Sequence, residues 1–158
     1  MQRNSEIEAF WQAYLDSLPE GSEQPVSYQA WYFSDNQKDA DELGELASAG
    51  IKTATSSLLW EYEAENEALP EAGGLNVVTN WAGEPLCIIE TREVRKWAFN
   101  EVDEAFARDE GEGDRSLSYW RKVHREAFKR TCAAIGREPA ENMPVVSERF
   151  RVVFPLPG

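Results

Sequence analysis

The chain has 158 residues, of which 42% are hydrophobic, and this is enough apolar material to fill the core of one domain. The formal net charge of -13 at pH 7 opposes binding to a long polyphosphate backbone, because such binding needs many lysine and arginine side chains. The longest apolar runs are far shorter than the roughly 20 residues that a transmembrane helix requires. Composition therefore predicts no membrane-spanning segment and disfavours broad, non-specific nucleic-acid binding.

The N-terminal residues and the cysteines indicate the compartment. The chain lacks the basic start, apolar middle and small-residue cleavage site of a secretory signal, so we expect a cytoplasmic protein. Cys87 and Cys132 are the only cysteines, which excludes a disulfide framework and a four-thiolate zinc site within one chain. We expect both to be reduced residues of the core.

A helix, a strand and a second helix are predicted in the first third of the chain. Ser5 and Glu8 form a capping box ahead of apolar residues at helical spacing, which end near Leu18. Residues 26–33 alternate between polar residues and β-branched or aromatic ones, as in a half-buried strand. Apolar residues from position 40 then mark one face of a helix that stops near Gly50, a suitable cap residue.

The middle of the chain is predicted to be rich in strands. A short helix over residues 58–65 and a loop at 70–74 come first. Residues 75–79 and 85–91 then flank a turn and are typical of a β-hairpin, and residues 94–99 extend the same sheet. These strands belong to a meander or a barrel.

Two helices and a last strand are predicted after the hairpin. Asn100 is expected to cap a helix that runs to about residue 109, before glycines interrupt it. Ser116 begins a longer helix with a buried apolar stripe, which ends at Gly136, and residues 147–154 alternate as a strand does. No repeat or linker divides the chain, so the predicted fold class is α+β, with strands surrounded by helices.

The segment after Gly50 contains a lysine and a threonine, Lys52 and Thr55, that converge if the backbone turns there. A lysine accepts a proton from a hydroxyl only when its pKa lies well below the normal value of about 10.4. In that state Lys52 could activate Thr55 for acyl transfer, while Glu110 positions the ammonium or relays protons. A lysine that simply lies beside a strand is the alternative interpretation.

Other residues in the sequence give weaker indications of a functional site. His124 is the only histidine, which excludes a two-histidine zinc helix and favours a packing or hydrogen-bonding role. Asp109, Glu110, Glu112 and Asp114 lack the alternating ligands of a calcium-binding loop, and most of this stretch is interpreted as a solvated acidic loop. The glycines among them match no nucleotide-binding fingerprint. No metal and no cofactor is therefore predicted.

Several separated motifs together resemble the longer bacterial proteins of the ASCH domain family, which belongs to the PUA-like superfamily. Their agreement extends over most of the chain, from about residue 26 to residue 154, so a chance match is not expected. The motifs are Trp31-Tyr32-Phe33, the helix over residues 40–46, Gly50-Ile51-Lys52-Thr53-Ala54-Thr55, Glu110-Gly111-Glu112-Gly113-Asp114, Trp120, His124 and Ser147-Glu148-Arg149-Phe150.

The resemblance implies a PUA-like β-barrel with a cleft near the Gly-Lys-Thr segment and an association with RNA metabolism. Residues 1–25 are then an N-terminal helical extension packed on the domain, and residues 26–158 form the ASCH domain. A nucleoside or RNA is the expected partner, and the oligomeric state is left open.

The resemblance also implies an activity. Small ASCH enzymes that hydrolyse N4-acetylcytidine use a lysine, a threonine three residues later and a downstream glutamate, and Lys52, Thr55 and Glu110 match them. By this resemblance Thr55 attacks the acetyl carbonyl, Lys52 removes its proton and Glu110 assists proton movement to the leaving group. Glu112 is the competing match for the glutamate. We therefore expect an amidohydrolase that removes an acyl group from N4-acylated cytidine or a related nucleoside.

Two other functions fit the sequence. Proteins that resemble this longer form are linked to metal-dependent cleavage of single-stranded RNA, for which the acidic loop could supply ligands. The second function is that of a non-catalytic RNA-binding module, in which Lys52 contacts a phosphate and an aromatic residue stacks on a base. The residues expected to bind substrate are Trp31, Tyr32, Thr53 and Arg149.

Overall fold

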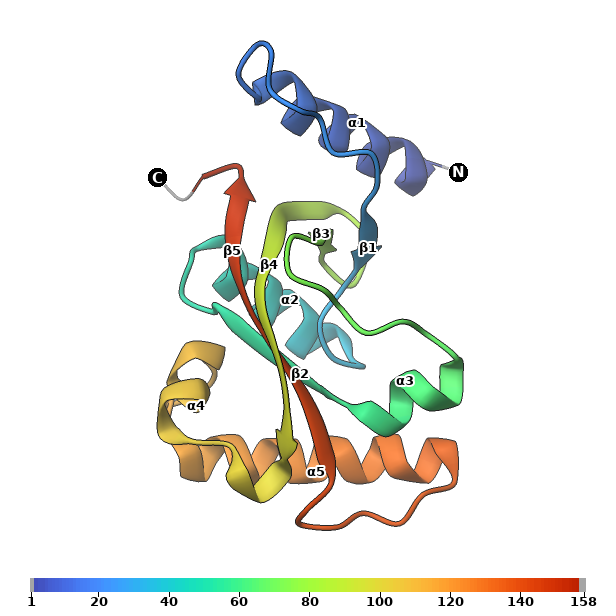
Figure 1. Ribbon diagram of the computed structural model, residues 1–158, viewed down its shortest axis with the longest axis vertical. Coiled ribbons are helices and arrows are strands. Elements are labelled where there is room, and N and C mark those ends of the chain that lie inside the picture. The colour runs from blue at the N-terminus through green and yellow to red at the C-terminus, as the bar shows by residue number, and fades with distance from the viewer. Residues whose placement is uncertain (1, 157–158) are drawn as a thin grey trace. The chain divides into compact units, whose positions relative to one another are not determined.

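The computed structural model describes the backbone of residues 2–156 and the side chains of residues 5–156. The chain divides into two compact units, whose helices and strands are labelled in Figure 1. Unit 1 consists of Met1–Gly50, Gly73–Glu90 and Arg151–Gly158, and unit 2 consists of Ile51–Ala72 and Thr91–Phe150. The strands hydrogen-bond in the order β1-β3-β4-β5-β2, and β4 and β5 contribute residues to both units.

Unit 1 combines two helices with short paired strands. Its elements are α1 (Gln2–Ser17), β1 (Gln29–Trp31), α2 (Gln37–Ser48), β3 (Leu75–Thr79) and the first residues of β4 (Pro85–Ala98). β1 runs parallel to β3, and β3 forms an antiparallel hairpin with β4, in which Leu75 lies opposite Glu90. The asparagine side chain of Asn36 accepts a hydrogen bond from the Asp39 N–H and so begins α2.

The core of unit 1 is built on the aromatic face of α1. Trp11 and Tyr14 are buried in one cluster with Val77 of β3 and Ile88 of β4. The ring of Phe154 packs edge-on against Phe10 and also lies beside Tyr14. The apolar stripe that predicted this helix therefore packs on the hairpin.

Unit 2 places helices against an antiparallel strand pair. Its elements are β2 (Ala54–Leu58), α3 (Leu59–Glu65), the second part of β4, the 3-10 helix η1 (Phe99–Glu101), α4 (Glu104–Glu110), α5 (Leu117–Ile135) and most of β5 (Pro144–Phe154). In the β2–β5 pair, Ala54 lies opposite Arg149 and Leu58 lies opposite Val145. α5 is in contact with α3, α4 and β2. Ser116 caps its start, and Gly136 ends it in a left-handed conformation.

Aromatic side chains fill the core of unit 2. Phe99 and Phe106 are fully buried, and Trp120 of α5 lies against both rings at centroid distances of 5.4 and 6.3 Å. Phe128 completes the cluster from the next turns of α5. Packing of this kind fixes α4 and α5 relative to each other, because aromatic pairs favour tilted and edge-on contacts.

The predicted α+β class and the predicted helices at 40–50, 58–65 and 116–135 are confirmed, as is the hairpin. Two local predictions were wrong. The strand predicted over residues 26–33 is limited to Gln29–Trp31, and Val26 is 97% exposed, because β3 offers partners only to those three residues. Asp103 rather than Asn100 caps α4, because Asn100 lies within η1 and the Asp103 side chain accepts a hydrogen bond from the Phe106 N–H.

Within the described residues, every helix is too short or too polar to cross a bilayer. The predicted separation of residues 1–25 from residues 26–158 stays a prediction.

Replacement of Phe99 by alanine tests the aromatic core of unit 2. The ring is fully buried, so its removal leaves a cavity, and we expect the free energy of unfolding to fall by about 3–5 kcal/mol. Urea denaturation followed by tryptophan fluorescence measures the loss. Val26→Ala, at an almost fully exposed position, is the control and should leave the midpoint unchanged. An unchanged midpoint for Phe99→Ala would contradict this core.

Candidate active site

The segment that precedes β2 is held against the end of α4 by its backbone. The Thr53 N–H donates to the Asp109 carbonyl at 2.8 Å, and the Thr53 carbonyl accepts from the Phe150 N–H at 3.0 Å. Gly111 ends α4 with a φ of +72°, and a Cβ atom there would lie 2.8 Å from the Ile51 carbonyl oxygen. Glycine is therefore required at this turn, because the dihedral angle disfavours a side chain and the close approach to the backbone leaves no room for one.

This approach buries Lys52 against two glutamates. The lysine side chain is 1% exposed, and Nζ donates to Glu110 Oε1 at 2.8 Å and to Glu112 Oε2 at 2.9 Å. It also lies 3.3 Å from the Glu110 carbonyl oxygen, at the C-terminal end of α4, where a positive charge is favourable. Lys52 is thus a buried cation with carboxylate partners on two sides.

Glu110 is the most heavily hydrogen-bonded member of the cluster. Its Oε1 accepts from Lys52, and its Oε2 accepts from Ser56 Oγ at 2.6 Å and from Trp120 Nε1 at 2.7 Å. His124 Nε2 lies 3.4 Å from the same Oε2. Charge-assisted hydrogen bonds of this number favour the ionised carboxylate.

The pKa values of the pair follow from these contacts. Burial disfavours the Lys52 ammonium, but the two carboxylates outweigh burial and raise the pKa of Lys52 above its usual value. Burial would likewise raise the pKa of Glu110, but Lys52, His124 and the hydrogen bonds lower it to about 2. At neutral pH the resting site therefore contains an ammonium and a carboxylate.

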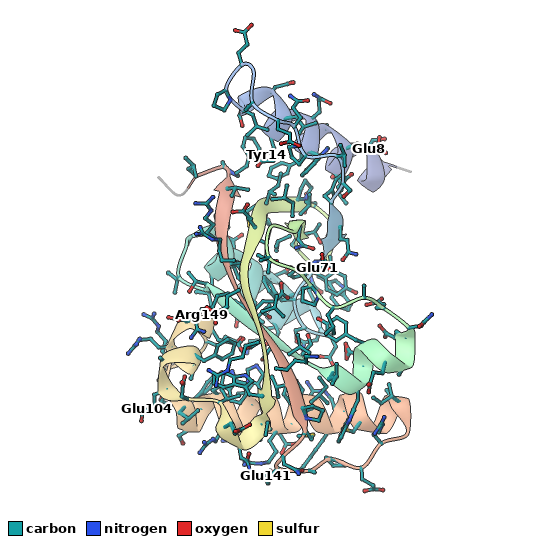
Figure 2. All side chains as sticks on the ribbon, viewed as in Figure 1. Glu8, Tyr14, Glu71, Glu104, Glu141 and Arg149 are labelled. Carbon is teal, nitrogen blue, oxygen red and sulfur yellow. The ribbon has the colours of Figure 1, made fainter. Side chains whose placement is uncertain are left out.

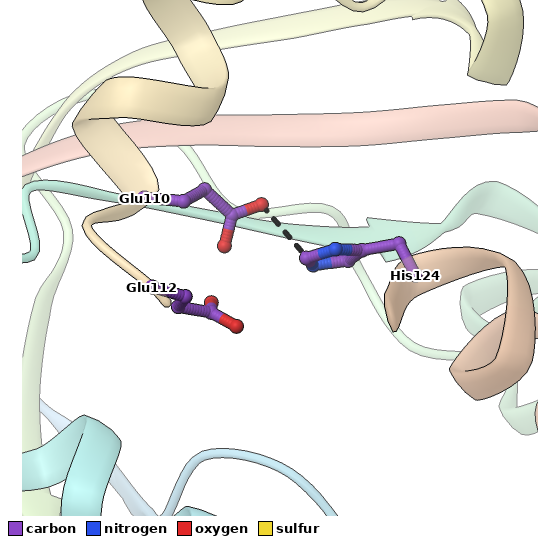
Figure 3. Close-up of side chains that lie close together, drawn as sticks. All are labelled: Glu110, Glu112 and His124. Carbon is purple, nitrogen blue, oxygen red and sulfur yellow. Dashed lines mark ion pairs between the residues drawn. The ribbon is translucent and has the colours of Figure 1, made fainter. Parts of the chain in front are cut away.

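Glu112 and His124 complete the cluster (Figure 3). The Glu112 side chain is 14% exposed, against 1% for Glu110. Burial and the nearby Glu110 raise the pKa of Glu112 more strongly than Lys52 lowers it. His124 stacks on Trp120 at a centroid distance of 4.2 Å, and its Nδ1 lies 2.9 Å from the Trp120 carbonyl oxygen.

Glu110, Glu112 and His124 are also the residues that could hold a metal ion, since they place one donor atom each within 4.8 Å of one another. Lys52 Nζ already lies within hydrogen-bonding distance of both carboxylates. A divalent ion would have to displace this ammonium or lie beside it, and like charges at that distance repel strongly in a buried site. The donor set therefore does not fit a resident metal well.

Thr55 and Ser56 are neighbours in β2, but their side chains point to opposite faces of the strand. Ser56 points to the face on which it hydrogen-bonds to Glu110. Thr55 lies opposite Glu148 of β5 and shares the other face with it. Among the described residues, Thr55 Oγ1 makes no hydrogen bond to Lys52, so the two predicted residues are close in the chain without being paired directly.

The two remaining predicted residues of unit 2 have internal partners. Thr53 Oγ1 is 3.3 Å from the Asp109 carbonyl oxygen. Arg149 Nε donates to Asp109 Oδ2 at 3.1 Å, and its NH1 lies 3.6 Å from Glu93 Oε1. The guanidinium also lies over the ring of Phe106. Both residues bind the end of α4 in this structure.

Trp31 and Tyr32 belong to unit 1 and differ in exposure. Trp31 donates from Nε1 to Asn76 Oδ1 at 2.8 Å and packs edge-on against Phe33. Tyr32 is 40% exposed and lies against Trp81, which is 38% exposed, at a centroid distance of 4.8 Å. Trp31 thus has a packing role, whereas Tyr32 presents an aromatic surface to solvent.

Three contacts of Glu110 were not predicted from the sequence. Trp120 and His124 lie four positions apart, a spacing that places both on one face of α5, so their proximity was detectable from the sequence. The sequence did not indicate that Glu110 is their common partner, because this contact depends on how α4 packs on α5. Ser56 gave no signal, since a serine in a strand is usually a surface residue.

The fold is that of solved ASCH domain structures. An ASCH domain from Lactobacillus crispatus JV V101 is 41% identical, with a TM-score of 0.89, and the match covers 97% of this chain and 95% of that one. A protein from Enterococcus faecalis V583 is 33% identical, with a TM-score of 0.83 and coverage of 94% and 88%. No curated protein is similar enough to the chain to match it.

Residues 29–154 also match the sequence model of the ASCH domain family. The chain belongs to this family, which is PUA-like and related to RNA. The predicted family and the predicted α+β fold are thereby confirmed.

Glu110→Gln tests the buried ion pair. The variant removes the principal counter-charge of Lys52, and we expect the free energy of unfolding to fall by about 3 kcal/mol, because a buried charge is left with weaker compensation. Chemical denaturation at pH 7 measures the change. Glu141→Gln is the control, since Glu141 pairs with Arg125 at the surface and should leave the midpoint unchanged (Figure 2). Equal midpoints for both variants would refute a stabilising pair.

The lowered pKa of Glu110 predicts a defined acid dependence of stability. Its pKa in the folded protein is about 2, below the ordinary value of 4.5, so its contribution is present above pH 4.5 and is lost as the pH falls toward 2. Denaturation midpoints between pH 7 and pH 2 should therefore show the wild type approaching Glu110→Gln as the pH falls. A constant difference over this range would be inconsistent with the lowered pKa.

Proposed function

We propose that the chain is an amidohydrolase that removes an acyl group from N4-acylated cytidine or a related nucleoside, with Lys52, Thr55 and Glu110 as its central residues. The observation that supports this most is the buried Lys52 ammonium, held by Glu110 at 2.8 Å and by Glu112 at 2.9 Å. A packing or solubility role does not require a lysine in this position, because a buried ion pair costs desolvation energy that apolar residues avoid. Such pairs are frequent at functional sites.

The charge state of Lys52 constrains its role in this chemistry. Its raised pKa means that it rests as an ammonium, and it becomes a base only after it has passed a proton to a neighbouring carboxylate. Both Glu110 and Glu112 lie within hydrogen-bonding distance for that transfer. The neutral amine can then accept the proton of a hydroxyl that attacks the acyl carbonyl, and the ammonium that forms stabilises the developing oxyanion.

Thr55 is the proposed nucleophile, because its position relative to Lys52 matches the family resemblance. Ser56 is the alternative, because its hydroxyl is hydrogen-bonded to Glu110 at 2.6 Å. That hydrogen bond directs the Ser56 proton to a carboxylate whose pKa is about 2, which makes Glu110 a weak base toward it. We therefore retain Thr55, whose hydroxyl must reach Lys52 from the other face of β2 in the reactive state, and assign Ser56 the positioning of Glu110.

The residues expected to bind substrate differ in how far their side chains are exposed or already bound to other residues. Tyr32 and the adjacent Trp81 expose aromatic surface on which a base can stack. Trp31, Thr53 and Arg149 remain candidates, although each has a protein partner. The same aromatic surface favours RNA binding without catalysis as the second function.

Release of cytidine from N4-acetylcytidine is the measurement that tests the activity. We expect turnover in the presence of a chelator, and we expect Thr55→Ala and Lys52→Met to lower kcat by about 10²-fold or more, because each removes a group that acts in the reaction. Circular dichroism establishes that each variant is folded. Thr55→Ser should recover part of the activity, since it restores a hydroxyl.

Ser57→Ala is the matched control, because Ser57 lies on the same face of β2 as Thr55, two residues away. It should retain wild-type turnover. Loss of turnover in Ser56→Ala but not in Thr55→Ala would transfer the nucleophile to Ser56. No turnover by the folded wild type would reject the amidohydrolase, and RNA cleavage abolished by chelator would establish a metal-dependent ribonuclease instead.

A further inference from the structure

The two glutamates bound to Lys52 have different environments. We propose that Glu112 is the carboxylate that exchanges protons with the substrate, and that Glu110 is the fixed counter-ion of Lys52. The inference rests on the proposed amide hydrolysis, within which it assigns the proton-transfer step. It reverses the assignment that the family resemblance favours, in which Glu110 moves the proton.

The contacts of Glu110 leave little capacity for substrate. Three donors lie within 2.8 Å of its carboxylate: Lys52 Nζ, Ser56 Oγ and Trp120 Nε1. His124 Nε2 lies 3.4 Å from the oxygen that two of them already share. A carboxylate has about four lone-pair sites. With a side chain that is 1% exposed, Glu110 is enclosed by protein donors and cannot approach a leaving group.

Glu112 has the opposite character. Its side chain is 14% exposed, and its hydrogen bond to Lys52 Nζ uses Oε2. It follows Gly111, so it lies beyond the end of α4 in a turn rather than within a packed helix. Figure 3 shows the carboxylates of Glu110 and Glu112 on the side of the cluster that faces the imidazole ring of His124. Of the two carboxylates, Glu112 is therefore the one that a bound nucleoside can reach.

In the proposed reaction, Lys52 transfers protons between Glu112 and the nucleophile. In the first half-reaction a proton moves from Lys52 Nζ to Glu112 Oε2 along the 2.9 Å hydrogen bond, which leaves a neutral amine and a carboxylic acid. The amine takes the hydroxyl proton as the nucleophile adds to the acyl carbon. Glu112 then gives its proton to the amide nitrogen as the C–N bond breaks, which releases the amino group and leaves an acyl ester on the protein.

The second half-reaction restores the site. Water adds to the acyl ester and gives a proton to the Glu112 carboxylate, while the Lys52 ammonium returns the hydroxyl proton as the ester C–O bond breaks. The released carboxylic acid and the free amine together account for the atoms of one amide and one water. Glu112 then returns its proton to Lys52. The raised pKa of Glu112 is consistent with a group that accepts and releases a proton in this cycle.

Two acyl substrates with different leaving groups distinguish the two carboxylates. N4-acetylcytidine requires protonation of its leaving nitrogen, whereas p-nitrophenyl acetate releases a phenolate that leaves without a proton donor. For Glu112→Gln we expect both rates to fall, because Glu112 also accepts protons from Lys52 and from water in the proposed cycle. We expect kcat on N4-acetylcytidine to fall at least about 10-fold further than hydrolysis of p-nitrophenyl acetate, because only the amide needs a proton donor for its leaving group. A role confined to holding the fold would lower both rates to the same extent.

Three variants complete the experiment. Glu112→Asp keeps a carboxyl group and should retain more amide turnover than Glu112→Gln. Glu104→Gln removes the same charge from an exposed position of α4 and should retain both activities (Figure 2). Glu110→Gln should lower both activities together, because it disturbs the Lys52 amine on which both substrates depend.

The outcomes separate this inference from the proposed function. A wild type that hydrolyses neither substrate rejects the amidohydrolase and the role of Glu112 with it. A wild type that hydrolyses N4-acetylcytidine, together with a folded Glu112→Gln variant of equal kcat, rejects the role of Glu112 alone. Equal losses on both substrates for Glu112→Gln would also reject it, since the defect would then lie in the Lys52 pair.

Discussion

Lys52 carries a positive charge at a position where its side chain is 1% exposed, and the surrounding residues of unit 2 are arranged to neutralise it. The charge would be very costly to bury alone, so the end of α4 brings Glu110 and Glu112 to it. The turn at Gly111 makes this possible, because it lets α4 end against the backbone of Ile51. Burial of the Lys52 ammonium thus holds the segment before β2 against the end of α4.

The residues around the two carboxylates give them different environments. α5 contributes Trp120 and His124 to Glu110, and β2 contributes Ser56, so Glu110 is fixed as an anion. Glu112 lacks this enclosure and is the more exposed of the two. A site with one locked and one accessible carboxylate on the same lysine can separate electrostatic stabilisation from proton transfer. This difference arises from packing, since both residues are glutamates two positions apart.

The strong negative charge of the chain is compatible with this chemistry. A neutral acylated nucleoside needs no extended basic surface, whereas a long RNA would meet repulsion from most of the molecule. Two arginines that could bind phosphate are also paired with carboxylates: Arg149 with Asp109 and Glu93, and Arg125 with Glu141. The exposed Tyr32 and Trp81 in unit 1 are better suited to stacking than to phosphate binding.

The sequence by itself determined the α+β class, the family and most of the helices, because amphipathic periodicity and capping residues such as Ser116 and Gly136 act locally. It also identified Lys52 and Glu110 as a pair through motif resemblance, although 58 positions separate them. It failed at residues 26–28 and 32–33, where a strand pattern found no partner strand, and at Asn100, which lies in a 3-10 helix that ends before α4 begins.

Only the tertiary structure decided the protonation and exposure of the site. The pKa of Lys52 is raised rather than lowered, because two carboxylates from one turn overcome the cost of burial. The enclosure of Glu110 likewise depends on the packing of α4 against α5 and β2, which brings donors from three segments to one carboxylate. Local patterns specify elements, but the charge state of a buried group depends on neighbours that are remote in the chain.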